Sequence, residues 1–172
     1  MSLQIESELR HLIARSSDCV WRRDKAGYAQ CWASDGEWRI LGQVVRGREA
    51  VADAWWTMMQ QYPNVWQLAH NVVFDFGGEA PIARVYLEET LVAPAGNVNL
   101  LKGIYHDSYV REDGLWRFAT RHIDIAYLGP SDFSGTWFPM RDHGPAPHNP
   151  DPDRAATPSM EEAYGSAAAG AA

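Results

Sequence analysis

Hydrophobic and polar residues recur with two different periods along this chain. In the first third the apolar positions follow a helical spacing, which predicts one helix from about residue 3 to residue 31 and a second that ends at Pro63. Between them, Gly36 supplies a turn and the stretch 37–42 is predicted as a short strand. The residues that lead from this strand into the second helix are predicted as a loop.

From residue 66 onward, apolar and polar residues alternate instead. Four such stretches are predicted as strands: 66–76, 82–93, 99–113 and 115–129. Because the connections between them are short, we expect an antiparallel meander. Helices followed by a run of long strands predict an α+β domain, in which a curved, mostly antiparallel sheet wraps on the N-terminal helices.

A chain of 172 residues, of which 46% are hydrophobic, suits one folded domain. We place that domain at residues 1–140. Residues 141–172 hold five of the ten prolines and end in an alanine-rich run. They are therefore predicted to be a disordered tail or an arm.

Charge and motif content narrow the function classes. The formal net charge of −7 argues against a nucleic-acid-binding surface, which is normally basic. No apolar run is long enough to cross a membrane, and the first residues lack the apolar segment of a signal peptide. Two cysteines, Cys19 and Cys31, fit reduced thiols of a cytoplasmic protein. The histidines lack metal-site spacing and no glycine-rich nucleotide motif occurs, so we expect neither a metal nor a nucleotide cofactor.

An acid and a histidine fall where apolar residues are expected. With helical spacing, Asp24 lies close to the direction of Ile13, so it is predicted to face the core. On the strand 66–76, His70 shares one face with Leu68. A histidine there is by default a hydrogen-bonded core residue. A pair with Asp24 would satisfy both groups and leave an imidazole that can act as a base.

Arg121 is the least ordinary charged residue of the last strand, because it shares a face with Ile123 and Ile125. A guanidinium on an apolar side needs an anion or a carbonyl group, which a substrate or a leaving group could supply. Asp107 shares its face with Arg111, which predicts an exposed, mixed-charge surface. Eight tryptophans either fill a core or line a pocket for an aromatic ligand.

The order of these pieces resembles the SnoaL-like branch of the nuclear transport factor 2-like superfamily. The likeness rests on "RRDKAGYAQCWASDGEW", "VVRGREAVADAWW", the strand with His70 and "GIYHDSYVREDGLWRFATRHIDIAYLGP", and it covers residues 3–140. Scytalone dehydratase and hexachlorocyclohexane dehydrochlorinase are the nearest members. The resemblance implies a cone-shaped α+β barrel, a deep apolar pocket at its open end, no cofactor, and a homodimer or homotrimer.

The resemblance also suggests roles for single residues. The dyad aspartate of the dehydrochlorinase falls on Asp24, its base histidine on His70, a pocket tryptophan on Trp38 and a pocket arginine on Arg121. Cys19 stands where the family has a catalytic lysine whose suggested role is to help a halide leave. This departure argues against dehydrochlorination itself.

These features predict a cofactor-independent lyase that acts on a small hydrophobic or aromatic molecule. His70 would take a proton, Asp24 would stabilise the imidazolium, and Arg121 with a tyrosine would hold the leaving group or an oxyanion. The reaction would be loss of water, or retro-aldol loss of formaldehyde from an aryl diol, as in diarylpropane lyases of this superfamily. The expected substrate-binding residues are Tyr28, Trp38, Trp55 and Tyr105.

Two other functions remain open. An isomerase similar to ketosteroid isomerase, or a polyketide cyclase, would use an aspartate as its base, for which Asp107 is the candidate. A non-catalytic binding module would keep Asp24 and His70 only as a hydrogen-bonded pair. Trp137 and Phe138 are expected either to close over the pocket or to serve a subunit interface.

Overall fold

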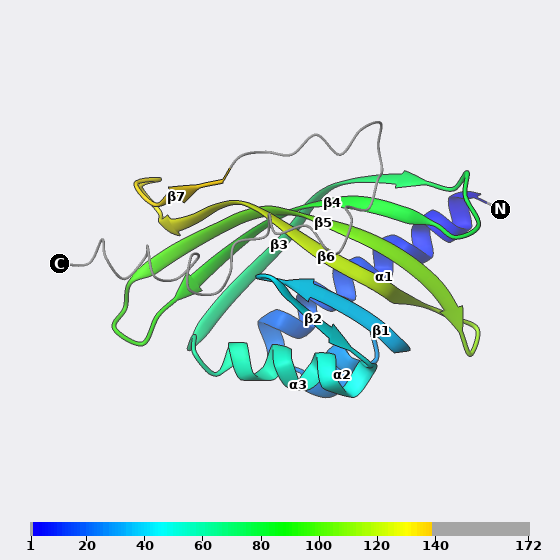
Figure 1. Cartoon of the computed structure of the whole chain (residues 1–172), viewed down its shortest axis with the longest axis horizontal. Helices are drawn as coiled ribbons and strands as arrows, with labels where there is room; N and C mark the ends of the chain where they lie inside the picture. The colour runs from blue at the N-terminus through cyan, green and yellow to red at the C-terminus, as the bar shows by residue number, and fades with distance from the viewer. Residues whose placement is uncertain (1, 139–172) are drawn as a thin grey trace.

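The computed structural model describes residues 2–138, in which three helices pack against one curved sheet (Figure 1). The predicted tail at residues 141–172 lies outside the described residues. The helices are α1 (Ser2–Arg22), α2 (Lys25–Ala29) and α3 (Arg48–Met59). The strands are β1 (Trp32–Ile40), β2 (Gln43–Arg46), β3 (Asn64–Asp75), β4 (Ile82–Val92), β5 (Val98–Glu112), β6 (Leu115–Pro130) and β7 (Thr136–Trp137).

The strands form one sheet in the order β2–β1–β6–β5–β4–β3, and the short β7 pairs with β6. β3 to β6 are an antiparallel meander, whereas β1 lies parallel to β6. The sheet curls around the helices without closing, since β2 and β3 are its two edges (Figure 1). The predicted α+β domain with a curved, mostly antiparallel sheet is confirmed, and its shape is an open cone.

The predicted helix over residues 3–31 is in fact two helices. Arg23 has a φ of 55°, which ends α1, and the Asp24 carboxylate accepts a hydrogen bond from the backbone N–H of Gly27 at 2.8 Å, which begins α2. The Arg23 guanidinium donates to the carbonyl oxygen of Tyr62 at 2.8 Å, just beyond α3, and so holds the break in place. A Cβ at Gly27 would lie 2.4 Å from an Asp24 carboxylate oxygen, so a larger residue there would displace the capping side chain.

The first hairpin also differs from the prediction. The residues that were expected to form a loop before the second helix contain β2, which pairs antiparallel with β1. Leu41 and Gly42 between the two strands have φ values of 50° and 74°, the pair of positive angles that a type I′ turn needs. Leucine is unusual in the first of these positions, so the sequence does not show the turn.

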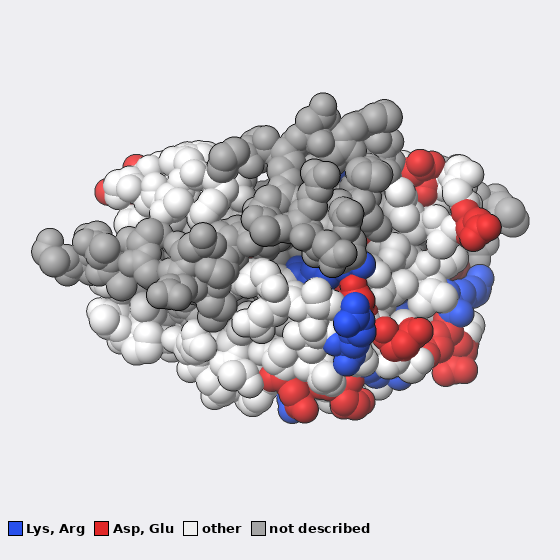
Figure 2. Space-filling model, viewed as in Figure 1, with Lys and Arg blue, Asp and Glu red and all other residues white. Residues whose placement is uncertain are grey.

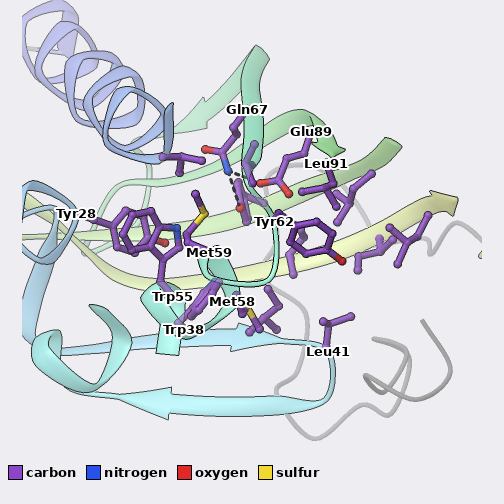
Figure 3. Close-up of a pocket in the computed structure, with 18 residues that line it drawn as sticks. Tyr28, Trp38, Leu41, Trp55, Met58, Met59, Tyr62, Gln67, Glu89 and Leu91 are labelled. Atoms are coloured by element: carbon purple, nitrogen blue, oxygen red, sulfur yellow. Dashed lines mark hydrogen bonds between the residues drawn. The ribbon is translucent and has the colours of Figure 1, made fainter. Parts of the chain in front are cut away.

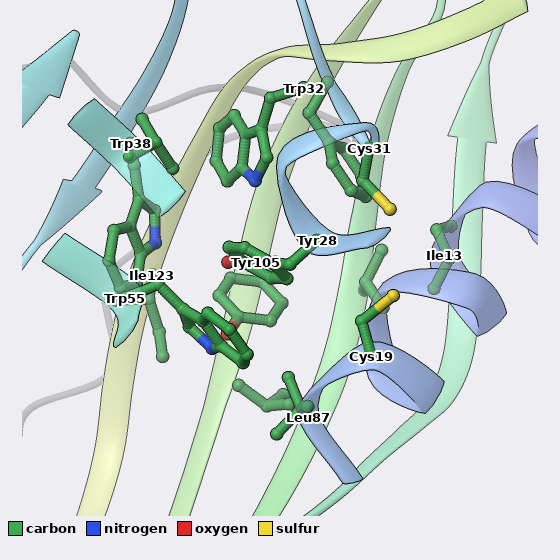
Figure 4. Close-up of a cluster of buried hydrophobic side chains, with 14 of the residues drawn as sticks. Ile13, Cys19, Tyr28, Cys31, Trp32, Trp38, Trp55, Leu87, Tyr105 and Ile123 are labelled. Atoms are coloured by element: carbon green, nitrogen blue, oxygen red, sulfur yellow. The ribbon is translucent and has the colours of Figure 1, made fainter. Parts of the chain in front are cut away.

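The core lies between the helices and the concave face of the sheet, and it is rich in aromatic side chains (Figure 4). Trp32 and Phe118 are fully buried, with ring centroids 5.5 Å apart, and they join β1 to β6. Cys19 and Cys31 are free thiols that lie close together in the same core. Part of the tryptophan content therefore serves packing rather than ligand binding.

Candidate functional site

A cavity lies between α3 and the concave face of the sheet (Figure 3). It holds about 70 Å³ of open space, enough for a few water molecules or a small organic group. Most of its lining is apolar. The ionisable side chains among its described lining residues are Tyr28, Tyr62, Glu89 and Tyr105, and no lysine, arginine or histidine is among them.

Glu89 is the carboxyl group in this lining, and a short chain of hydrogen bonds holds it. It lies on β4 directly opposite Gln67 of β3. The Gln67 side chain donates from Nε2 to Glu89 Oε1, and its Oε1 accepts a hydrogen bond from the Ser17 hydroxyl at 3.0 Å. Gln67 Nε2 also donates to the Tyr105 hydroxyl oxygen at 3.4 Å (Figure 3). One amide therefore links the carboxyl group to a phenol.

The environment raises the pKa of Glu89. Burial is the main cause, because an apolar setting disfavours the charged carboxylate. The hydrogen bond from Gln67 and the positive charge of Arg121 lower the pKa but do not cancel the effect of burial. A carboxyl group of raised pKa beside a cavity exchanges its proton closer to neutral pH than an ordinary glutamate does.

Aromatic side chains from several elements surround the cavity. Tyr28 of α2 stacks on Trp55 of α3, with ring centroids 4.3 Å apart and planes inclined by 17°. Trp38 of β1 contributes its indole ring, whose buried Nε1–H has no hydrogen-bond partner among the described residues. The residues predicted to bind substrate, Tyr28, Trp38, Trp55 and Tyr105, all line this cavity, and their contact with a substrate stays a prediction.

Arg121 is not among the residues that line the cavity. Its Nε and Nη2 donate to the Asp107 carboxylate at 2.8 and 2.7 Å, and both side chains are fully buried. The guanidinium also lies against the rings of Tyr105 and Phe118, 4.1 and 3.8 Å from their centroids. Burial by itself would lower the pKa of Arg121, but the attraction of Asp107 outweighs it and raises the pKa. Asp107 thus supplies the anion that the arginine needs, and the exposed face predicted for Asp107 is wrong.

The structure does not bring Asp24 and His70 together. Asp24 caps α2, and His70 is exposed on the outward side of β3. Neither residue lines the cavity. The predicted inward orientation of His70 is therefore wrong, and the acid–base roles predicted for the pair have no support from this geometry.

A β-bulge in β3 explains the position of His70. β3 pairs with β4 in one register up to Ala69 and in a shifted register from Val72 onward. The shift reverses the alternation, so Gln67 and Ala69 face the core before the bulge and Val72 faces it afterwards. Leu68, on the other side of the strand, is 41% exposed.

Glu89 and Gln67 are site residues that were not predicted from the sequence. Glu89 carried a usable signal, because it shares its strand face with Leu87 and Leu91. A charged residue among apolar neighbours on one strand face is the same pattern that marked Arg121. Gln67 carried no such signal, since its inward orientation depends on where the bulge falls.

Trp137 and Phe138, predicted as lid or interface residues, lie at β7 and just after it. Trp137 is 59% exposed and packs on Tyr127, with ring centroids 4.8 Å apart. Neither residue lines the cavity. The described residues therefore show no lid at this position, and the interface role stays a prediction.

Two features are absent from residues 2–138. No three His, Cys, Asp or Glu side chains of this range are grouped closely enough to hold a metal ion. No helix of the same range is both long and apolar enough to span a membrane.

The family model of the SnoaL-like domain matches residues 1–122, which is more than half of the chain. The chain belongs to the SnoaL-like family. The predicted resemblance is therefore confirmed. No curated protein sequence matches this SnoaL-like chain.

Solved structures share the fold of this SnoaL-like domain. An aspartate-to-asparagine variant of Rv3472 from Mycobacterium tuberculosis, described as a protein of unknown function, is 26% identical over 74% of this chain and 79% of its own, with a TM-score of 0.66. Hexachlorocyclohexane dehydrochlorinase LinA-type3 from Novosphingobium barchaimii is 19% identical over 81% and 97% of the two chains, with a TM-score of 0.69. A protein from Novosphingobium aromaticivorans, provisionally named a scytalone dehydratase, is 17% identical over 87% and 97%, with a TM-score of 0.69.

Proposed function

We propose that this SnoaL-like domain is a lyase that eliminates water from a small, largely apolar substrate, with Glu89 as the residue that moves the proton. The observation that carries the proposal is a carboxyl group of raised pKa in a cavity whose described lining contains no cationic side chain. Fold relatives named as a dehydrochlorinase and, provisionally, as a scytalone dehydratase support the lyase class. The role predicted for His70 passes to Glu89 in this proposal.

A single carboxyl group can carry out such an elimination. The Glu89 carboxylate takes a proton from the carbon next to the one that bears the hydroxyl group. The electron pair of the broken C–H bond forms the double bond, and the C–O bond breaks. The proton then passes from Glu89 to the departing hydroxyl group, so that water leaves and the carboxylate is restored. Gln67 keeps the carboxyl group oriented through its hydrogen bond to Oε1.

Hydrogen-bond donors around the cavity suit a substrate that carries oxygen. Burial raises the pKa of Tyr28 and of Tyr105 well above the ordinary value, so both hydroxyl groups stay neutral donors. Together with the unpaired indole N–H of Trp38, they can bind the leaving hydroxyl group or a carbonyl oxygen. The apolar remainder of the lining suits a hydrocarbon or aryl group.

The size of the cavity favours loss of water over retro-aldol loss of formaldehyde from an aryl diol. The open space of about 70 Å³ admits a small substrate, whereas a bulky diol requires side chains such as Met58 and Met59 to move. The homodimer or homotrimer, the cytoplasmic location and the absence of a cofactor stay part of the proposal. Each of them rests on the family resemblance and on composition.

Binding without catalysis is the second candidate function, and the aromatic lining favours it. Rings of Tyr28, Trp38 and Trp55 beside one carboxyl group form a setting that attracts a protonated amine or a quaternary ammonium group. In that case the positive charge of the ligand lowers the pKa of Glu89, and no product forms.

Turnover of a panel of small hydroxylated aryl and alkyl compounds, and of amines of the same shapes, separates the two candidates. Mass spectrometry follows the loss of one water molecule, and circular dichroism checks the fold. The matched control for Glu89→Gln is Glu88→Gln, because Glu88 is the neighbouring carboxylate on β4 and pairs with Lys102. We expect product with the wild type and with Glu88→Gln, and none with Glu89→Gln. Unchanged turnover in Glu89→Gln overturns the proposal, whereas saturable binding of amines without product favours the binding function.

A further inference from the structure

A second hollow lies on the surface between α1 and the β5–β6 hairpin, and it shares no lining residue with the Glu89 cavity. Its volume is about 410 Å³. One wall is a single face of α1, and the other is the tip of the hairpin with the first residues of β6. We call it the α1–hairpin groove, and its lining residues are Ser7, Glu8, His11, Leu12, Arg15, Gly114, Leu115, Trp116 and Arg117.

Arg117 is the buried charge of the α1–hairpin groove. Its side chain is 7% exposed, Nη1 donates to the carbonyl oxygen of Gln30, and Nε has no partner among the described residues. No ion pair joins Arg117 to any carboxylate within residues 2–138. A buried guanidinium without a counter-ion is costly, because burial removes the water that would solvate its charge. An anion in the groove would supply the missing counter-charge.

Two further arginines lie in or near the α1–hairpin groove and favour an anion. Arg15 and His11 line it from α1, and Arg111 lies 5.9 Å from the centroid of the Trp116 ring on the hairpin side. Glu8 is the carboxylate in the described lining, and it already accepts a hydrogen bond from the Gln4 amide at 3.0 Å. On the face seen in Figure 2, acidic and basic side chains are mixed on the half of the molecule that carries the N-terminus, so the preference for an anion rests on the groove itself.

The apolar part of the lining indicates the kind of anion. Leu12 is buried beneath the groove, Leu115 is 55% exposed at its rim, and the Trp116 ring forms part of the wall. The space is far larger than an inorganic oxyanion fills. We propose that the α1–hairpin groove binds a small organic carboxylate, with its carboxylate group on Arg117 and Arg15 and its apolar body against Leu12 and Trp116. This site is independent of the reaction proposed for Glu89.

Titration of the full chain with benzoate, inorganic phosphate and benzyl alcohol, followed by calorimetry, tests the inference. We expect saturable binding of benzoate and none of benzyl alcohol. Arg117→Gln is expected to weaken benzoate binding by at least about tenfold, and Arg15→Gln by about threefold, because charge-assisted hydrogen bonds are lost. Arg10→Gln is the matched control, since Arg10 is an exposed arginine on α1 that pairs with Glu6 and lies outside the groove.

Each other result overturns the inference. Absence of saturable benzoate binding does so, and so does an equal loss of affinity in Arg10→Gln and Arg15→Gln, which would indicate only a diffuse positive surface. Phosphate binding as tight as benzoate binding would show that the groove does not select an organic carboxylate. Loss of benzoate binding in Glu89→Gln would move the ligand to the cavity. Arg15→Gln keeps the test decisive if Arg117→Gln fails to fold, because Arg15 is exposed.

Discussion

Two charged sites lie on the concave side of the sheet, and they differ in whether hydrogen bonds join them to a group of opposite charge. Arg121 and Asp107 neutralise each other through two hydrogen bonds and lie outside the cavity lining. Glu89 accepts a hydrogen bond from the neutral amide of Gln67, and it lines the cavity. Removal from water therefore gives a fixed ion pair in one place and a carboxyl group with altered proton affinity in the other. The first arrangement stabilises the fold, and the second is available for chemistry.

Breaking the ion pair between Asp107 and Arg121 has the largest expected effect on stability. Asp107→Ala leaves the Arg121 guanidinium buried without an anion, so we expect the free energy of unfolding to fall by about 3–5 kcal/mol. Denaturant unfolding followed by tryptophan fluorescence measures the change. A double variant, Asp107→Leu with Arg121→Met, is expected to recover most of the loss because it removes both charges. A single variant that loses less than about 1 kcal/mol would show that the pair does not stabilise the core.

Glu89 should make the stability of the folded protein depend on pH. Because the folded-state pKa of Glu89 is raised, the folded protein binds this proton more tightly than the unfolded chain does. The stabilising contribution of the group is complete below its ordinary pKa and is lost as the pH rises through the raised value. We therefore expect Glu89→Gln to become more stable relative to the wild type as the pH rises from the ordinary pKa of glutamate towards neutrality.

Unfolding free energies of both proteins over that pH range test this expectation. Glu88→Gln serves as the control, because Glu88 is the neighbouring carboxylate on β4 and forms a salt bridge with Lys102. Parallel curves for the wild type and Glu89→Gln would mean that Glu89 is solvated normally, and the contrast between the two charged sites would disappear.

Tyr105 touches both sites, since its ring lies against Arg121 and its hydroxyl oxygen accepts a hydrogen bond from Gln67. Tyr105→Phe keeps the ring and removes the hydroxyl group. We expect kcat to fall about tenfold, with stability changed by less than about 1 kcal/mol. Tyr109→Phe is the control, because that hydroxyl group donates to Asp107 at 3.2 Å, outside the cavity lining. Equal effects on kcat would indicate a general packing role rather than a donor in the cavity.

A smaller effect is expected at the start of α2. Asp24→Ala removes the side chain that caps this helix, so we expect a loss of about 1 kcal/mol, while Asp24→Asn retains most of the stability. Thermal and denaturant unfolding measure both. If turnover instead falls strongly in Asp24→Asn while the fold stays intact, Asp24 has a chemical role that its capping geometry does not explain.

The alternation of apolar and polar residues, together with the short connections between strands, was enough to predict the antiparallel meander. Each of the four long strands has one face in the core, so its alternation shows in the sequence, and the short connections between them allow antiparallel pairing alone. The break at Arg23 was not predictable in this way. It depends on a left-handed backbone angle and on the contact between Arg23 and the carbonyl oxygen of Tyr62, far along the chain.

The candidate site was predictable only in part. Trp38 and Trp55, which were predicted to bind substrate, line the cavity because they lie on the buried faces of their elements. The need of Arg121 for an anion was correctly inferred, but its partner Asp107 lies 14 residues earlier on the neighbouring strand and became visible only through the pairing of β5 with β6. The bulge in β3 has no marker in the local pattern, because residues 66–74 alternate plausibly in either phase.

His70→Ala is expected to have the smallest effect of all. The side chain is exposed beyond the cavity, so we expect a change in stability within about 0.5 kcal/mol and unchanged turnover. Gln67→Ala is the matched comparison on the same strand, since it frees the Glu89 carboxyl group and should lower turnover. Turnover assays of both variants show whether Gln67 or His70 of β3 faces the cavity. A variant series in which His70→Ala abolishes turnover and Gln67→Ala does not would mean that β3 pairs without the bulge, with His70 in the cavity.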